Sequence, residues 1–269
     1  MTFYPKISVI TVVRNGEKYL ESAIKSITEQ TYGNLEYVVI DGNSSDNTVN
    51  IIKRYSDKIS YWISEEDEGI YDAMNKGIQS SSGDWLLFIN SDDYLISMDI
   101  IERAVTYLKE CNSLIGYGKI IVEYPSSPET IYGSDWESTK ENFRNVGMCI
   151  QHQATFHSRA LFANNLFDTS FKIAGDYDLL LRYLRNHDAY YIPLVITKMR
   201  AVGVSHTVSR IKLLKENRRV QIKNKMYKVI PPLSWISFSL KVIMVDKFIR
   251  IFGIERKNKL KKLIGRFKG

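Results

Sequence analysis

The segment Gly83-Asp84-Trp85-Leu86-Leu87-Phe88-Ile89-Asn90-Ser91-Asp92-Asp93 joins a hydrophobic run of strand type to an amide and two carboxylates. Carboxylates at the end of a buried strand are costly unless they reach solvent or hold a cation. Open α/β sheets bind their ligands at strand ends of this kind. Oxygen ligands suit Mg²⁺ or Mn²⁺, which usually also contact substrate phosphates. The segment predicts an α/β fold and a metal-dependent enzyme that acts on a nucleoside diphosphate compound, although a polar loop cap is the plain alternative.

Strand and helix patterns alternate around this segment. Apolar runs rich in β-branched residues predict buried strands over 7–13, 36–41, 59–63 and 85–89. Between them, helical spacing predicts helices over 20–27, 48–55 and 71–80. Short links between alternating elements indicate a mostly parallel, doubly wound sheet with helices on both faces.

Beyond residue 95 the alternation weakens. The pattern predicts helices over 98–109 and 176–185, and strands over 114–124, 130–133 and 189–200. The chain has 269 residues, so it can hold one large domain or a domain with an appendage. Its two cysteines do not make a disulfide framework, which favours a reducing compartment. The start resembles no signal peptide, and no apolar run reaches the roughly 18 residues typical of a membrane-spanning helix.

The charge of the chain is divided unevenly. Residues 210–269 hold 18 Lys/Arg and 3 Asp/Glu, which leaves 19 basic and 27 acidic residues in 1–209. We therefore predict a globular domain over 1–209 and a basic helical tail over 210–269. The tail contains a basic helix over 211–226 and a largely apolar helix over 233–252 that is flanked by lysines.

Such a tail indicates an anionic partner. An apolar helix flanked by lysines and carrying Trp235 is typical of an element at a membrane interface. Dimerisation through the apolar helix is an alternative. Nucleic acid is disfavoured, because the lysines alternate with large aliphatic residues and no nucleic-acid-binding module is present.

Two phosphate-binding motifs are missing. The first predicted strand is followed by Arg14-Asn15-Gly16, whereas a dinucleotide-binding turn requires a three-glycine pattern. A Walker loop is also absent from the sequence. These absences argue against an NAD-dependent enzyme and a P-loop nucleotidase.

Other candidate residues each have a plain structural alternative. Asp41 ends a predicted strand at the same edge as Asp92, where it could bind a base or ribose or simply form a turn. Asp46 is better explained as a helix cap. Asp176 begins a predicted helix, so it could be a general base with a raised pKa or a capping residue, while capping most easily explains Asp178.

Several segments, in the same order along the chain, resemble the family 2 glycosyltransferases, which have the GT-A fold. They are 8–15, 38–48, 67–77, 90–93, 151–156 and 173–178. The similarity covers about residues 5–206 and is strongest to enzymes of bacterial polysaccharide synthesis, of the colanic-acid and O-antigen type. Three positions depart from the family pattern: Gly42 replaces the second Asp of the nucleotide-binding turn, Asn90 replaces the first Asp of the DxD motif, and Gly175 replaces the Glu of the ED motif.

The resemblance implies a role for each matching residue. Residues that would bind the donor are Thr11, Val13, Asn15, Asp41, Asp67, Asn75, Lys76, Asn90 and Ser91. Asp92 would ligate Mn²⁺ or Mg²⁺ on the diphosphate, and His206 would approach the same metal ion. Asp176 would be the catalytic base, and His152 and Gln153 would lie on the acceptor side, although a lone histidine is more often structural.

The implied activity is that of an inverting glycosyltransferase. It would move a sugar from a nucleotide-sugar donor, with uracil the expected base, to a lipid-linked saccharide acceptor. The expected location is the cytoplasmic face of a bacterial plasma membrane, with the tail as peripheral anchor and a homo-oligomer possible. A non-catalytic nucleotide-sugar-binding partner of a polysaccharide synthesis complex is the alternative, supported by Gly175 and Asn90.

Overall fold

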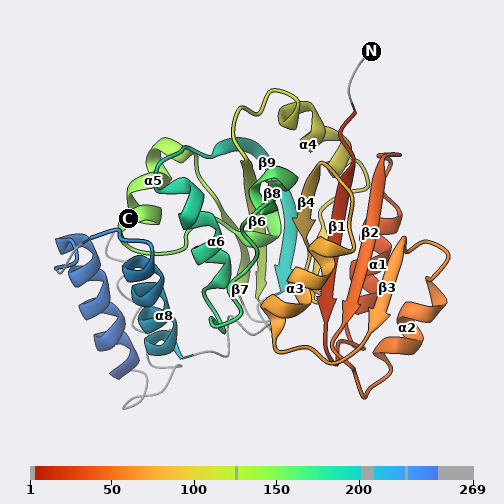
Figure 1. The fold of residues 1–269 in the computed structure, drawn as a ribbon, viewed down its shortest axis with the longest axis horizontal. Coiled ribbons are helices and arrows are strands. Elements are labelled where there is room, and N and C mark those ends of the chain that lie inside the picture. The colour runs from red at the N-terminus through yellow and green to blue at the C-terminus, as the bar shows by residue number, and fades with distance from the viewer. Residues whose placement is uncertain (1–3, 125–126, 201–208, 228–229, 248–269) are drawn as a thin grey trace.

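A central sheet with helices on both faces forms the core of the protein (Figure 1). The computed structural model describes residues 4–124, 127–200, 209–227 and 230–247. Within them the sheet has nine strands in the order β3-β2-β1-β4-β8-β6-β9-β5, with β7 paired to β6. The α/β fold predicted from the sequence is therefore confirmed.

The first half of the sheet is parallel. Its strands are β1 (Ile7–Val13), β2 (Leu35–Asp41), β3 (Tyr61–Ser64) and β4 (Trp85–Phe88). Helices α1 (Leu20–Thr28), α2 (Thr48–Arg54) and α3 (Ile70–Gln79) connect them. Each element lies within two residues of its predicted range, because apolar periodicity and short polar links mark the boundaries clearly.

The second half of the sheet is mixed. It comprises β5 (Asp93–Leu95), α4 (Ile100–Leu108), β6 (Ile115–Tyr124), β7 (Ser127–Tyr132), α5 (Trp136–Asn145), η1 (His152–Ala154), β8 (Thr155–Ser158), η2 (Arg159–Phe162), α6 (Gly175–Leu184) and β9 (Tyr190–Arg200). Strand β8 lies between β4 and β6 and is antiparallel to both. The sequence did not predict β5, α5 or β8, because α5 is mostly polar and because β5 and β8 pair with strands distant in the sequence.

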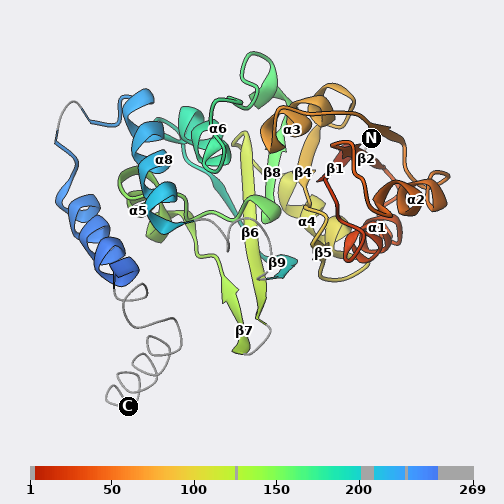
Figure 2. The same ribbon diagram turned by 90° about the horizontal axis from the view of Figure 1, so that it is seen from below.

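The side chains of β1 alternate between two hydrophobic clusters, one on each face of the sheet. Ile7 and Val9 face a cluster that includes the apolar sides of α1, α2 and α4. Ile10 and Val12 face a second cluster, built with α3, α5 and α6. Figure 2 shows these helices on opposite sides of the strands, with the β6–β7 hairpin projecting from the sheet. Both faces are thus covered, and ligands have access at the strand ends.

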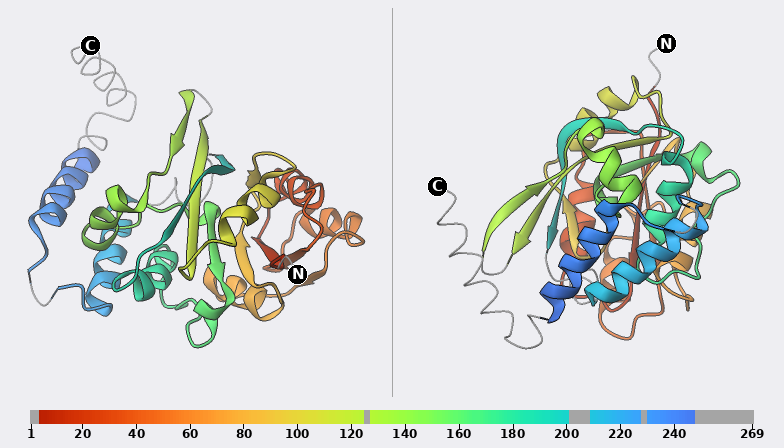
Figure 3. Two further views of the ribbon diagram at one scale, coloured as in Figure 1. Left: turned by 90° about the horizontal axis from the view of Figure 1, so that it is seen from above. Right: turned by 90° about the vertical axis from the view of Figure 1, so that its left-hand side faces the viewer.

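Helix α8 (Arg210–Lys223), the first helix of the predicted tail, packs against α6 (Figure 3). Its Val220 is buried in the same cluster as Leu180 of α6. Residues 233–247 form a further helix, and the Arg218 guanidinium of α8 lies over the Trp235 ring of that helix. In the described parts of the chain, no helix combines the length and apolar character needed to cross a membrane.

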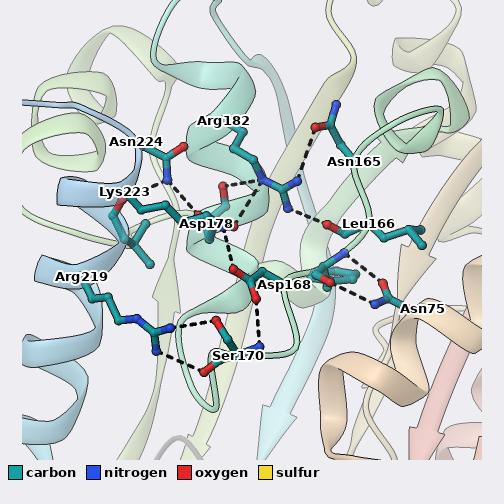
Figure 4. Close-up of polar contacts among 12 residues, drawn as sticks. Asn75, Asn165, Leu166, Asp168, Ser170, Asp178, Arg182, Arg219, Lys223 and Asn224 are labelled. Atoms are coloured by element: carbon teal, nitrogen blue, oxygen red, sulfur yellow. Dashed lines mark hydrogen bonds and ion pairs between the residues drawn. The ribbon is translucent and has the colours of Figure 1, made fainter.

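Asp178 is fully buried between α6 and α8 (Figure 4). Its carboxylate accepts hydrogen bonds from Lys223 Nζ at 2.9 Å and Asn224 Nδ2 at 2.8 Å, and Arg182 Nε lies at 3.3 Å. The interpretation of Asp178 as a capping residue is therefore wrong. Capping requires only local backbone donors, whereas this carboxylate joins two helices far apart in the sequence.

Candidate active site

A cavity of about 650 Å³ opens at the carboxyl ends of the parallel strands. Parallel pairing places Val13 beside Asp41 and Asp41 beside Ser64, so β1, β2 and β3 end at one edge. The arrowheads of these strands meet along the lower edge of the sheet in Figure 1. The lining residues are Val12, Val13, Arg14, Asn15, Gly16, Lys18, Tyr19, Asp67, Gly69, Ile70, Ala73, Asn90, Ser91, Asp92, Asp93, Gln153, Met199 and Arg200.

Seven of the predicted site residues line this cavity. They are Val13, Asn15, Asp67, Asn90, Ser91, Asp92 and Gln153. The other described candidates lie outside its wall; they are Thr11, Asp41, Asn75, Lys76, His152 and Asp176. His206 lies outside the described residues. The cavity therefore gathers groups from the ends of β1 and β4 and from the loop before α3.

The turns after β1 and β2 hold one another beside the cavity. Asn15 adopts a left-handed backbone conformation (φ 54°), which asparagine tolerates better than most residues. Its backbone N–H donates to Ser44 Oγ at 2.7 Å, and its Oδ1 accepts from the Ser45 N–H at 2.9 Å. Asp46, one residue before the N-cap Asn47 of α2, accepts from the Thr48 N–H at 3.0 Å, so it bonds the first residue of the helix without occupying the cap position itself.

Asp41 is fully buried behind this turn. Its carboxylate accepts hydrogen bonds from the Ser44 N–H at 3.0 Å and from Ser64 Oγ at 2.6 Å. These contacts correspond to the turn-forming interpretation of Asp41. In this conformation the oxygens of Asp41 accept hydrogen bonds from Ser44 and Ser64. Asp41 therefore holds the turn beside the cavity and does not face the cavity itself.

The Asp67 carboxylate occupies the space above Gly42. A Cβ atom at Gly42 would lie 2.1 Å from Asp67 Oδ2, which no real contact allows. Asp67 Oδ1 accepts from the Gly69 N–H at 2.9 Å, so the carboxylate is held in place from the other side. Gly42 stands where the family pattern has an Asp. The carboxylate of Asp67, from the loop before α3, occupies the space that a side chain at position 42 would need.

Two carboxylates lie together at the end of β4. Asp92 and Asp93 both line the cavity, and Asn90 Nδ2 donates to Asp93 Oδ2 at 3.1 Å. Asp93 Oδ1 is buried and has no hydrogen-bond partner among the described residues. Burial raises the pKa of Asp93 to about 8, and the charge of Asp92 adds to this shift. The sequence analysis did not assign Asp93, although it directly follows Asp92.

This pair fits a divalent cation that binds together with a diphosphate. In the parts of the chain that the structure describes, no group of three or more acidic, histidine or cysteine side chains is arranged to hold a metal ion. Mg²⁺ is commonly held by one or two carboxylates, with substrate phosphates and water as the remaining ligands. Asp92 and Asp93, which both line the cavity, are the carboxylates that would supply such ligands.

A basic side chain lies beside the carboxylates. The Arg200 guanidinium packs over the rings of Tyr19 and Tyr94, at 4.9 and 4.6 Å from their centroids, and donates to the Asp92 carbonyl at 2.9 Å. Arg14 and Lys18 add exposed cations to the wall. The sequence analysis missed Arg200, because only the pairing of β5 with β9 brings it next to Asp92.

Most of this cavity lies in a part of the chain that matches a known protein family. Residues 8–167 match the model of glycosyl transferase family 2, which is more than half of the chain. The chain belongs to glycosyl transferase family 2. The resemblance seen in the sequence is therefore confirmed at the level of the family.

This family 2 glycosyltransferase has similar relatives among known proteins. It is 32% identical over 211 residues to an uncharacterized glycosyltransferase of Mycobacterium tuberculosis, covering 76% of this chain and 78% of that one. It is 29% identical over 206 residues to a PGL/p-HBAD biosynthesis glycosyltransferase of Mycobacterium bovis, covering 75% and 76%. The family assignment thus extends over most of both chains.

Solved structures share the fold. S. aureus TarS 1–349 in complex with UDP-GlcNAc superposes with a TM-score of 0.65 at 19% identity, covering 84% of this chain and 68% of that one. The mannosyltransferase PcManGT from Pyrobaculum calidifontis, in complex with GDP-Man and Mn²⁺, gives 0.63 at 17% identity, covering 86% and 67%. A longer TarS chain is matched over 39% of its length. These likenesses establish a glycosyltransferase fold of GT-A type.

The expected base of this glycosyltransferase lies behind the start of α3. Asp176 is half-buried, and its Oδ1 accepts from the Tyr177 N–H at 2.8 Å, with the Tyr71 hydroxyl at 3.4 Å. Desolvation by burial raises its pKa to about 6. Asp176 is not among the residues that line the cavity; its hydrogen bond to Tyr71, the residue after the cavity-lining Ile70, links it to the start of α3.

Three other candidates are held in structural contacts. The Asn75 amide exchanges two hydrogen bonds with the backbone of Phe167 (Figure 4), at 3.0 and 2.9 Å. Lys76 pairs with Glu65 at 2.8 Å. Thr11 is buried and accepts from the Tyr37 hydroxyl. Asn75 and Lys76 thus join α3 to the loops that carry Phe167 and Glu65, and Thr11 belongs to the interior of β1.

His152 lies in the core beside the cavity. Its ring stacks on Phe88 with centroids 5.0 Å apart, and neither ring nitrogen has a hydrogen-bond partner among the described residues. Burial lowers its pKa to about 3, so the ring is neutral. Of the two residues predicted to lie on the acceptor side, Gln153 lines the cavity and His152 does not.

Replacing Gly42 with Ala is expected to destabilise the fold by roughly 1 kcal/mol relative to Gly33→Ala, because the added methyl group forces the Asp67 carboxylate out of its hydrogen bond with the Gly69 N–H. Gly33→Ala is the matched control, since a Cβ atom there has no neighbour within 4 Å. Urea denaturation of both variants measures the difference. Equal stability of the two variants would contradict the described contact between Gly42 and Asp67.

Proposed function

We propose that this protein is an inverting, metal-dependent glycosyltransferase that moves a sugar from a UDP-sugar to a hydroxyl group of a lipid-linked saccharide in bacterial surface polysaccharide synthesis. The observation that carries the donor assignment is the cavity at the strand ends, where Asp92 and Asp93 lie beside Arg200. This arrangement suits a nucleoside diphosphate with a bound cation. The complex of TarS with UDP-GlcNAc and that of PcManGT with GDP-Man and Mn²⁺ support the same classes of donor and metal.

The donor would span the cavity from the end of β1 to the segment after β4. Asn15 and Asp41 would form the base-binding end through the turn that they hold, and Asp67 would face the nucleoside. Asn90 and Ser91 would lie near the ribose, and Arg200 near the diphosphate. The start of α3, at Gly69 and Ile70, would direct the positive end of the helix dipole at the phosphates.

Transfer would proceed by direct displacement at the anomeric carbon. The acceptor hydroxyl attacks from the face opposite the diphosphate, so the anomeric configuration inverts. Asp176 takes the proton of that hydroxyl as the new bond forms. Mg²⁺ or Mn²⁺ bound by Asp92 and Asp93 would supply neutralisation of the negative charge that develops on the diphosphate. Arg200 adds a fixed positive charge on the same side.

Replacing Asp92 with Asn is expected to weaken Mn²⁺-dependent binding of UDP at least about 100-fold, because a metal ligand loses its charge. Isothermal titration of UDP, GDP and dTDP, each with Mn²⁺ and with a chelator, measures this. Asp57→Asn is the control, since Asp57 is exposed and lies outside the cavity. If none of the three nucleotides binds, the donor assignment fails; if metal-dependent binding survives in Asp92→Asn, only the metal ligand is wrong.

The lipid-linked acceptor implies contact with a membrane surface. The helix of 233–247 exposes Leu233, Leu240 and Met244, whose spacing places them on one side. Exposed lysines at 241 and 247 accompany this apolar stripe. Each lysine near an anionic bilayer contributes about 1 kcal/mol to binding. We therefore assign the stripe to the inner face of a bacterial plasma membrane.

The triple substitution Leu233→Asp, Leu240→Asp and Met244→Asp in the full chain is expected to reduce binding to anionic vesicles at least roughly tenfold, because apolar contact area is lost and negative charge is added. Co-sedimentation with phosphatidylglycerol vesicles measures the effect. Met98→Asp is the control, because Met98 is about as exposed as Met244 but lies before α4, away from the helix of 233–247. Unchanged binding of the triple variant would refute a membrane role for this helix.

A further inference from the structure

The start of α6, where Asp176 lies, is held by a carboxylate from α8. Glu216 accepts hydrogen bonds from the backbone N–H groups of Ile173 at 2.8 Å and Ala174 at 2.9 Å, and a longer one from Lys172 at 3.2 Å. These three residues directly precede α6. Of these three donors, only the N–H of Ala174, the N-cap residue of α6, is among the helix N–H groups that lack a partner within the helix. The negative charge of Glu216 also lies at the helix N-terminus, where it complements the helix dipole.

Position 175 itself cannot supply that carboxylate. A Cβ atom at Gly175 would lie 2.7 Å from the Tyr71 ring, so the ring fills the space that a side chain would need. Tyr71 is buried, and its hydroxyl donates to the Ile173 carbonyl at 2.7 Å. The residue before Asp176 is thus a glycine because α3 packs against it, and the carboxylate at this helix start comes from α8 instead.

We infer that Glu216 is a positioning residue for Asp176: it fixes the turn at 172–174 that carries Asp176 and places a second negative charge beside it. This inference rests on the proposed role of Asp176 as the base. It gives α8 a part in catalysis, because the same helix that precedes the membrane-facing segment orients the start of α6. Tyr71 from α3 completes the arrangement by bonding the same turn.

Polar and charged groups from α3 and α8 shift the pKa of Asp176 in opposite directions. Glu216 faces it from α8 and raises its pKa by repulsion, which adds to the larger effect of burial. Tyr71 faces it from α3, and its hydroxyl lowers the same pKa. The cations nearby are directed elsewhere, since Lys172 Nζ donates to the Glu68 carbonyl and Arg219 donates to Ser170.

The test is the pKa of Asp176 in the full chain, read from the carboxyl ¹³C signal of Asp-labelled protein and assigned with Asp176→Asn. Glu216→Gln keeps an oxygen for the N–H groups but removes the charge. We expect the pKa of Asp176 to fall, because a neighbouring negative charge is removed, and the acid limb of the activity profile to move to lower pH with it. Glu110→Gln, an exposed carboxylate after α4, is expected to change neither.

An unchanged Asp176 pKa in Glu216→Gln would overturn the inference. Glu216→Ala, which also removes the acceptor, is expected to lower the melting temperature and to reduce kcat more than it raises KM for the donor. Equal kcat in Glu216→Ala and the parent would likewise overturn it. The proposed role of Asp176 as the base is tested separately. It fails if Asp176→Asn retains full transfer activity, regardless of the pKa measured in Glu216→Gln.

Discussion

Replacing Asp176 with Asn is expected to lower the rate of sugar transfer by roughly 10²- to 10⁴-fold, which is the usual contribution of a general base. The amide oxygen of Asn can still accept from the Tyr177 N–H, so the start of α6 should keep its shape. Donor binding should therefore be unchanged. Single-turnover transfer assays measure the rate, and titration with UDP and Mn²⁺ measures the donor affinity.

The pH dependence of the parent protein provides an independent check of this role. Burial raises the pKa of Asp176 to about 6, and only the ionised carboxylate can take a proton. The rate should therefore rise with pH on an acid limb near pH 6 and level off above it. Comparable transfer by Asp176→Asn, or a rate independent of pH between 5 and 7, would remove Asp176 from the mechanism.

Replacing Asp178 with Ala is expected to destabilise the protein by about 3 kcal/mol, because it breaks a buried charge network between α6 and α8. The carboxylate accepts from Lys223 and Asn224 of the α8 region, and Arg182 lies beside it. Its loss leaves the buried Asn224 amide without one acceptor. Urea denaturation measures the change in the free energy of unfolding.

Asp99→Ala is the matched control for this prediction. Asp99 also pairs with an arginine four residues later, Arg103, but both side chains are about half exposed. Exposed pairs contribute little to stability, so Asp99→Ala should unfold almost like the parent. Similar unfolding curves for Asp178→Ala and Asp99→Ala would show that α8 does not depend on the buried carboxylate.

The network has a consequence for experiments on the tail. Removing all residues after Arg210 would delete Lys223 and Asn224, uncover Asp178 and leave Arg182 as its remaining side-chain partner among those described. Such a truncation would disturb the packing of α6 as well as remove the helix of 233–247, to which we assign membrane binding. Substitutions on the surface of 233–247 separate the two effects, because Leu240 and Met244 are exposed.

The sequence alone predicted the parallel half of the sheet. Strands β1, β2 and β4 and helices α1 to α3 follow from apolar periodicity, which depends only on neighbouring residues. The same local signals predicted the cavity, because parallel strands that end in polar residues bring those residues to one edge. Asn90 and Asp92 were found in this way, whereas the role of Asn15 came from the resemblance to the family.

Only the tertiary structure showed how the departures from the family pattern are accommodated. Gly42 lies under Asp67, and Gly175 lies under Tyr71, so residues around the start of α3 fill both spaces. Glu216 reaches the start of α6 from α8, across 42 residues of sequence. No local pattern encodes these contacts, because the partners are joined by packing and their spacing in the chain is arbitrary. The sequence therefore determined which chemical groups the protein carries at its strand ends, and the packing of α3, α6 and α8 decided which of them meet.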